Sequence, residues 1–216
     1  MGLLLSILGP KDDPILIDGL KDAKKPLLVN IDPSSKSSIP VIRSVNERGG
    51  LEFTWAVWMN IKNLETTCNG EKYSHVFNKG SAMKKHDTQA TSNGPGLYLN
   101  RCENKLKIVM DVIGSDNTNI PEDIIIENIP LNKWINVGIR VQQKTIDVFI
   151  NGEIKKRHTL SYIPKQNYSP VYVNMNEGFD GEISELRYFS RCLTGLEFIN
   201  LAKKGPNMRQ YSKHGL

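Results

Sequence analysis

Apolar and polar residues alternate along much of this chain, and the alternation begins sharply at Leu51. Every second residue from Leu51 to Ile61 is apolar, while polar residues such as Glu52 and Asn60 lie between them. A period of two over this length predicts a long strand with one buried face. Trp58 falls on the polar side. We therefore expect that the N-terminal arm covers this side, which is the favoured interpretation, or that Trp58 contacts a partner.

Shorter alternating runs follow, with turn signals between them. Asn151-Gly152 is one signal, because both residues accept the positive φ angles of a two-residue type I′ hairpin turn. Gln143-Lys144 marks a second turn, and the glycine-rich stretch 93–96 is interpreted as a turn between strands. Such closely spaced strands, without amphipathic helices between them, predict a sandwich or barrel. We expect strands over residues 73–77, 97–99, 106–112, 124–126, 135–141, 146–150, 171–175 and 183–189.

One helix is expected near the C-terminus, where Thr194 and Glu197 have the spacing of a capping box and glycine and proline follow at 205–206. Prolines are frequent between residues 10 and 50, which predicts an extended arm with one or two short edge strands. The expected organisation is an apolar segment and proline-rich arm over residues 1–50, a sandwich over 51–204 and a loose polar tail over 205–216.

The composition is that of a soluble globular protein with a formal net charge of +5 and a sequence pI near 9.0. This balance favours acidic partners. No aromatic ladder or recognition helix accompanies the basic residues, so nucleic acid is not an expected partner. Lys155, Lys156 and Arg157 form a dense basic cluster. With Trp58 they are candidate partner-binding residues, and the alternative is a solvated strand edge.

Cys68, Cys102 and Cys192 form no CxxC pair and have no histidine at metal-ligand spacing. The odd count argues against a secreted framework held by disulfides. The expectation is therefore reduced thiols in a cytoplasmic setting, and a bridge between Cys68 and Cys102 is the open alternative.

Two segments resemble the laminin-G-like domains of the concanavalin A-type jelly roll. The first begins at Trp134, reads WINVGIRVQQKTIDVFINGEI, and is similar to a pair of strands joined by a short turn. The second begins at Phe179, reads FDGEISELRYFSRCLTGLEFI, and is similar to that family's closing strand and helix. With FTWAVW from Phe53, the resemblance covers about residues 51–204. It implies an all-β, two-sheet antiparallel jelly-roll sandwich, to which the arm and one short C-terminal helix are added.

The run IPVIRSVNERGGLEFTWAVW, which begins at Ile39, also resembles laminin-G-like proteins encoded by large DNA viruses. This second resemblance implies a minor capsid or membrane-associated component of a virion. The expected location is then the virion or the host cytoplasm rather than the secretory route, and other structural protein subunits are the expected partners.

The same sandwich carries lectins and glycan hydrolases, so the chemistry has to come from the residues. Hydrolases need paired carboxylates on one strand, in an E-x-D-x-E arrangement, and no such triplet occurs. Glu182 and Glu185 are predicted to face opposite sides of their strand. Ser184 stands where the family's closing strand often has aspartate. We expect a non-catalytic binding or structural module and no enzyme; the alternative is a carbohydrate-binding, lectin-like protein with a glycan partner.

Calcium is the one ion that the resemblance implies, and no other cofactor is expected. Residues 111–123 are rich in hard oxygen ligands at irregular spacing, which calcium tolerates. Asp111, Asp116 and Asp123 are the candidate ligands. Asp and Asn are also ordinary turn formers, and this is the competing interpretation.

The chain begins MGLLLS, which matches the signal for myristoylation of Gly2. A single myristoyl chain binds a membrane only marginally, and the apolar run 3–8 with the lysines that follow it adds further attraction. The prediction is membrane contact through the N-terminus. The alternative is a short segment packed on the sandwich or on a neighbouring subunit.

Overall fold

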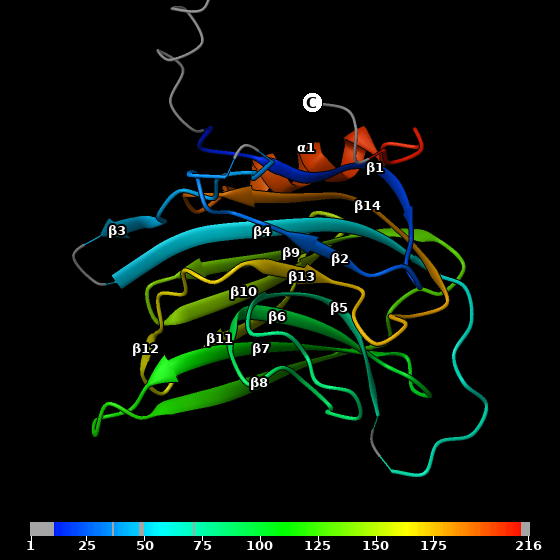
Figure 1. Cartoon of the computed structure of the whole chain (residues 1–216), viewed down its shortest axis with the longest axis horizontal. Helices are drawn as coiled ribbons and strands as arrows, with labels where there is room; N and C mark the ends of the chain where they lie inside the picture. The colour runs from blue at the N-terminus through cyan, green and yellow to red at the C-terminus, as the bar shows by residue number, and fades with distance from the viewer. Residues whose placement is uncertain (1–10, 36, 48–49, 71, 213–216) are drawn as a thin grey trace, which may run out of the picture.

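The computed structural model describes residues 11–35, 37–47, 50–70 and 72–212. Two antiparallel sheets of seven strands pack face to face, and helix α1 (Gly195–Lys204) lies on the outer side of one of them (Figure 1). This is the all-β sandwich that the sequence predicts. No helix within the described ranges is long and apolar enough to cross a membrane.

The first sheet has the strand order β1-β14-β4-β9-β10-β11, with β3 paired to β4. Its strands are β1 (Ile15–Asp22), β3 (Val45–Glu47), β4 (Gly50–Ile61), β9 (Trp134–Gln142), β10 (Thr145–Ile150), β11 (Glu153–Thr159) and β14 (Gly181–Phe189). The second sheet has the order β12-β7-β6-β5-β13-β2, with β8 paired to β7. Its strands are β2 (Leu27–Val29), β5 (Tyr73–Gly80), β6 (Asn93–Asn100), β7 (Lys105–Ile113), β8 (Asn119–Glu127), β12 (Ile163–Pro164) and β13 (Val171–Val173).

The alternating residues of β4 lie at the centre of the core, as predicted. Trp55, Met59 and Ile61 are completely buried between the sheets. The ring of Trp55 packs against Phe77 of the second sheet, with 5.4 Å between the ring centroids. Ala56 faces the other way and belongs to a separate apolar cluster on the outer side of the first sheet.

Helix α1 covers this outer cluster. Its Phe198 stacks on Phe149 of β10, with 3.7 Å between the ring centroids. Gly138 of β9 makes the approach of the helix possible, because a Cβ at this position would collide with the Phe198 ring. The capping box predicted at Thr194 and Glu197 is present, with both of its hydrogen bonds.

The predicted hairpin turns are confirmed. Asn151 and Gly152 have φ angles of 53° and 87° and join β10 to β11, as a type I′ turn requires. Gln143 and Lys144 join β9 to β10. The stretch 93–96 is not a turn: it lies within β6, because its backbone continues the ladders with β5 and β7.

The arm contributes edge strands to both sheets, as its prolines predict. β1 pairs with β14 and β2 pairs with β13, and Ile17 is completely buried in the same core as β4. The segment after α1 was expected to be loose, and this expectation is wrong for its first residues. The N–H of Leu20 donates to Arg209 O at 2.6 Å, and the N–H of Tyr211 donates to Leu20 O at 2.8 Å. The free edge of β1 supplies the backbone groups that hold this segment.

Candidate functional site

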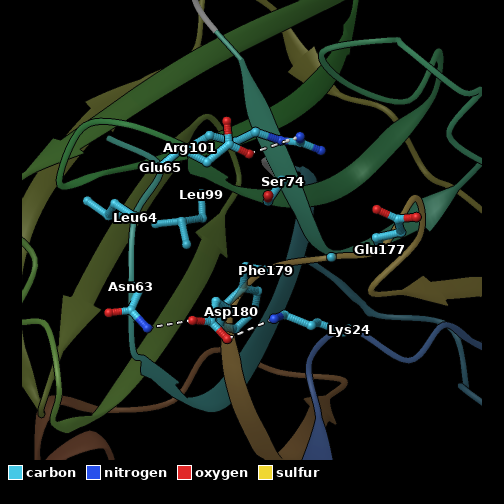
Figure 2. Close-up of a pocket in the computed structure, with 11 residues that line it drawn as sticks. Lys24, Asn63, Leu64, Glu65, Ser74, Leu99, Arg101, Glu177, Phe179 and Asp180 are labelled. Atoms are coloured by element: carbon cyan, nitrogen blue, oxygen red, sulfur yellow. Dashed lines mark hydrogen bonds and ion pairs between the residues drawn. The ribbon is translucent and has the colours of Figure 1, made fainter. Parts of the chain in front are cut away.

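A pocket of about 560 Å³ opens at the end of the sandwich where β4 runs into the following loop (Figure 2). Four parts of the chain form it: the turn between β1 and β2, the loop after β4, the adjacent ends of β5 and β6, and the loop before β14. We call it the end pocket. Its lining residues are Lys24, Asn63, Leu64, Glu65, Ser74, Leu99, Arg101, Glu177, Gly178, Phe179 and Asp180.

The floor of the end pocket is apolar and belongs to the core. Leu99 and Phe179 are buried, and Leu64 packs partly buried against the same cluster. Figure 2 shows these three side chains grouped between two sets of polar residues. A floor of this kind suits the less polar face of a ligand.

Asp180 organises one rim of the end pocket. The Nδ2 of Asn63 donates to its carboxylate at 2.6 Å, and the Nζ of Lys24 forms an ion pair with it at 3.0 Å. These two contacts hold the pKa of Asp180 below its usual range. The carboxylate is therefore ionised at neutral pH and joins three segments of the chain.

Arg101 and Glu65 form the other rim. Their side chains form an ion pair at 3.2 Å, and the N–H of Glu65 donates to Arg101 O at 2.7 Å. Beside them, Cys68 and Cys102 form a disulfide that ties the loop after β4 to the turn after β6. The expectation of reduced thiols is wrong for this pair, because the fold places two cysteines 34 positions apart side by side. Cys192 is a free thiol.

The disulfide determines whether this rim can bind a metal ion. Glu65, Cys68 and Cys102 place three potential ligand atoms within 4.8 Å of one another, the one such group among the described residues. The two sulfur atoms are bonded to each other, so neither is the thiolate that a metal ion needs. The oxidised rim offers no metal site.

Glu177 adds a carboxylate without a cation beside it. The next residue, Gly178, has a φ angle of 46°, and a Cβ there would collide with the carbonyl oxygen of Ala23. This close approach fixes the loop that carries Glu177. In the described ranges Glu177 forms no ion pair, so the lining combines two cations with three carboxylates and is weakly acidic.

The lining supplies several kinds of hydrogen-bonding group. The carboxylates of Asp180 and Glu65 are each held by a cation, and the lining contains no histidine. Glu177 and Ser74 complete the polar groups of the lining. Planar amide, carboxylate and guanidinium groups around an apolar floor are the donors and acceptors that hydroxyl-rich ligands need.

A protein-family model, Laminin_G_3, matches residues 35–197, which is most of the chain. It describes the concanavalin A-like lectin/glucanases superfamily. The chain belongs to this superfamily. The laminin-G-like resemblance of the two quoted segments and the jelly-roll fold that it implies are thereby confirmed.

Several solved structures of other proteins share the fold of this chain. The receptor-binding domain of botulinum neurotoxin D matches with a TM-score of 0.59 and 12% identity, over 89% of this chain and 47% of that chain. The binding domain of botulinum neurotoxin serotype G matches with a TM-score of 0.56 and 13% identity, over 86% and 46%. This chain therefore spans less than half the length of both. A comparison with curated protein sequences gives no match.

A third similar structure is described by the dependence of cell entry of botulinum neurotoxin type C on interaction with two ganglioside molecules. It matches with a TM-score of 0.51 and 15% identity, over 71% of this chain and 35% of that chain. At this identity the likeness shows the fold alone.

Trp58 is buried on the outer face of the first sheet, with 7% of its surface exposed, so its prediction as an exposed partner-binding residue is wrong. It pairs across the sheet with Ser184, whose hydroxyl donates to Asn207 O at 2.8 Å. Directly paired residues face the same side of a sheet. The segment after α1 therefore lies over this face, whereas β1 of the arm extends the edge of the sheet.

The basic cluster lies on β11, an edge strand of the first sheet, with its three side chains exposed. Arg157 contacts the buried Asp147 at 2.6 and 3.0 Å, and Arg140 shares the same carboxylate. Lys156 donates to the carbonyl of Ile125 at 3.3 Å. Lys155 forms no ion pair within the described ranges. A partner-binding role for this solvated strand edge stays a prediction.

The three calcium candidates each have a separate place in the fold. Asp111 is buried on β7 and accepts from the N–H of Asn93 at 3.0 Å. Asp116 accepts hydrogen bonds within the turn before β8. Asp123 pairs with Lys107 at 3.6 Å. Among the described residues, none of the three joins a group of three ligand atoms within 4.8 Å of one another, although Asp111 and Asp123 lie on the paired strands β7 and β8.

Glu182 and Glu185 lie on the same side of β14, contrary to the sequence prediction. The pairing of β14 with β4 is regular up to Ser184 and then shifts, and Glu185 has a φ angle of 46°. The bulge turns Glu185 toward α1, where it contacts Lys204 at 2.8 Å. Glu182 is held by Lys62 at 3.4 Å. Each carboxylate therefore has its own lysine.

The myristoylation motif at Gly2 lies outside the described residues and stays a prediction. The end pocket itself was missed by the sequence analysis. Lys24, Asn63, Arg101 and Asp180 come from four distant segments, and no local pattern links them. The one available signal was the FDG motif, which places Asp180 just before the closing strand.

Proposed function

We propose that this chain is a non-catalytic carbohydrate-binding module whose glycan site is the end pocket. The observation that carries the proposal is the lining, in which an apolar floor of Leu99 and Phe179 lies between two rims of hydrogen-bonding side chains. A sugar ring has a nonpolar face and a rim of hydroxyl groups. The floor and the rims complement these two parts of a sugar.

The comparisons support the proposal. The superfamily includes lectins by name, and the similar solved structures are binding domains of neurotoxins, one of them described by its interaction with gangliosides. Because this chain spans less than half of those chains, the ganglioside itself is not carried over to it.

The order of the rims supports a binding role. Asn63, Asp180 and Lys24 are already joined to one another, and the Cys68–Cys102 disulfide fixes the loop beside Glu65. Side chains that are held before a ligand arrives lose less conformational freedom on binding. The rims are therefore pre-organised for recognition.

A glycan array followed by a cleavage assay tests this function. The purified protein is screened on the array, and each bound glycan is then incubated with the protein and analysed for shorter products by chromatography. We expect binding without cleavage. Cleavage of a bound glycan would contradict the claim that the module is non-catalytic. Failure to bind any glycan on a broad array would contradict the claim that it binds carbohydrate.

A structural role in a virion is the second candidate function, and it rests on the sequence. The run from Ile39 resembles virus-encoded proteins, and Gly2 lies in a myristoylation motif that favours membrane contact. Other structural subunits would then be the partners. The Cys68–Cys102 disulfide favours an oxidising location over the reducing cytoplasm.

Proteomics of purified particles together with intact-mass spectrometry of the native N-terminus tests the structural role. The virion role predicts the protein in the particles and a myristoyl group on Gly2. Particles that lack the protein would exclude this role, and an unmodified N-terminus would exclude the lipid anchor.

A further inference from the structure

A second and smaller cavity lies at the opposite end of the sandwich, near the start of β4. We call it the inner cavity. The end pocket begins beyond Ile61, at the other end of the strand, and the two cavities share no lining residue. The lining residues of the inner cavity that matter here are Ser44, Trp55, Lys79, Gln166 and Tyr188.

Lys79 points into the sandwich, which is unusual for a lysine. It pairs across β5 and β13 with Val171, a completely buried core residue, so both face the interior. Only 6% of Lys79 is exposed. Its Nζ donates to Ser169 O at 3.0 Å, which uses one of the three hydrogens of the ammonium group.

No carboxylate balances this charge within the described part of the chain. The inner cavity is lined by Lys79 and Lys165 and by no Asp or Glu. Lys165 acts electrostatically on Asp111, whereas Lys79 has no acidic partner. Burial lowers the pKa of Lys79 to about 8, so the ammonium is still charged at neutral pH. A buried charge without a counter-charge destabilises the fold.

Trp55 also lines the inner cavity, and it carries a second unfilled donor. Its side chain is completely buried, and its Nε1 has no hydrogen-bond partner among the described residues. Three polar side chains of the lining already interact with one another: Tyr188 interacts with Ser44, and the hydroxyl of Ser44 donates to Gln166 at 3.0 Å. Buried N–H groups without an acceptor are rare in folded proteins.

The size of the inner cavity limits its occupant. It leaves about 10 Å³ for the centre of a water-sized particle, enough for one small ion or one water molecule. A monatomic anion fits this small volume better than a polyatomic anion such as sulfate. A water molecule satisfies the indole N–H but leaves the lysine charge unbalanced, whereas a monatomic anion does both.

We propose that the inner cavity binds one monatomic anion of the halide class, held by Nζ of Lys79 and Nε1 of Trp55. Chloride is the halide that biological fluids supply. An ion that binds only the folded chain stabilises it. The site is independent of the end pocket, so its failure leaves the proposed glycan binding untouched.

Thermal unfolding in different sodium salts at equal ionic strength tests the site. The wild type is expected to unfold roughly 3–6 °C higher in chloride or bromide than in gluconate when the halide is at about ten times its Kd. Lys79→Met should lose this difference between salts, whatever its own stability. Lys133→Met removes an exposed charge near the end pocket and should retain the difference.

Crystals of the wild type grown in bromide give an independent readout. An anomalous peak between Lys79 Nζ and Trp55 Nε1 is expected. The experiment uses only the wild type, so its outcome does not depend on whether a variant folds. A wild type that unfolds at the same temperature in all three salts would overturn the proposal. An equal halide effect in Lys79→Met, or a cavity without a bromide peak, would overturn it as well.

Discussion

Asn63 donates a hydrogen bond of 2.6 Å to Asp180, although the two residues lie 117 positions apart. The bond joins the loop after β4 to the segment that leads into β14. Lys24 of the arm reaches the same carboxylate. One exposed acid thus connects three segments at the rim of the end pocket, and the account of this protein as a binding module depends on that rim.

Asp180→Asn should weaken glycan binding far more than it weakens the fold. The Lys24–Asp180 ion pair is solvent-exposed, and exposed pairs contribute at most about 1 kcal/mol to stability. Loss of a charge-assisted contact to a ligand costs about tenfold or more in affinity. Urea unfolding and calorimetric titration on the same preparations measure the two effects. Equal loss in both would show that Asp180 has only a structural role.

Removal of the disulfide should lower stability and loosen the rim beside Glu65. For a sequence separation of 34 residues, the double variant Cys68→Ser with Cys102→Ser should lose about 3–4 kcal/mol. Urea unfolding with and without a reducing agent measures this loss. The wild type should fall to the level of the variant when reduced, whereas the variant should not respond. A wild type that is indifferent to reductant contradicts the bridge.

Acid should destabilise the protein through His75, which is buried beside Tyr98. Its Nδ1 accepts from the N–H of Met175 at 3.0 Å, and its Nε2 lies 2.8 Å from Asn78 Oδ1. Burial lowers the pKa of His75 to about 4. Because the folded pKa lies below the unfolded value near 6.5, the unfolded chain binds more protons between these values, and stability falls as the pH falls through this window.

The expected size of this effect is roughly 2 kcal/mol lower stability at pH 5 than at pH 7.5. Urea unfolding across this range measures it. In His75→Gln the slope of stability against pH between 5 and 6.5 should flatten, even if the variant is less stable throughout. An unchanged slope would assign the effect to another group.

Alanine substitutions at two glycines with similar φ angles distinguish the cost of backbone strain from the cost of a steric collision. Gly152 and Gly70 have φ angles of 87° and 80°. A Cβ at Gly152 would lie 2.9 Å from Ile199 Cα in helix α1, whereas nothing lies within 4 Å of a Cβ at Gly70. Gly70→Ala should therefore lose about 1 kcal/mol from strain alone, and Gly152→Ala roughly 2 kcal/mol or more. Equal melting temperatures would show that the helix moves away without cost.

The strands and turns could be predicted because their signals are local. The period of two in β4 and the Asn151-Gly152 dipeptide are patterns of neighbouring residues. The sequence alone is therefore enough to recognise them. The side on which Glu185 lies could not be predicted, because the bulge depends on the register between β14 and β4. A shift of one residue reverses the facing of a side chain.

The sites are harder to predict than the strands because they depend on tertiary contacts. Cys68 and Cys102 meet only after β5 and β6 have paired. In the sequence, Lys79 occupies an ordinary polar position. Only its cross-strand pairing with Val171 shows that it faces the core. Ser184, the cross-strand neighbour of Trp58, bonds to a segment after α1 whose composition indicates a loose tail.

Calorimetric titration of the best array glycan tests the central claim, with variants at two places on the surface. Arg101→Ala removes a cation from the rim of the end pocket, and Tyr168→Ala removes an aromatic ring that is 70% exposed outside it. Exposed tyrosines are common sugar-stacking groups, so Tyr168 is the strictest control. The account predicts at least about tenfold weaker binding for Arg101→Ala and unchanged binding for Tyr168→Ala. The reverse pattern would contradict the end pocket as the glycan site.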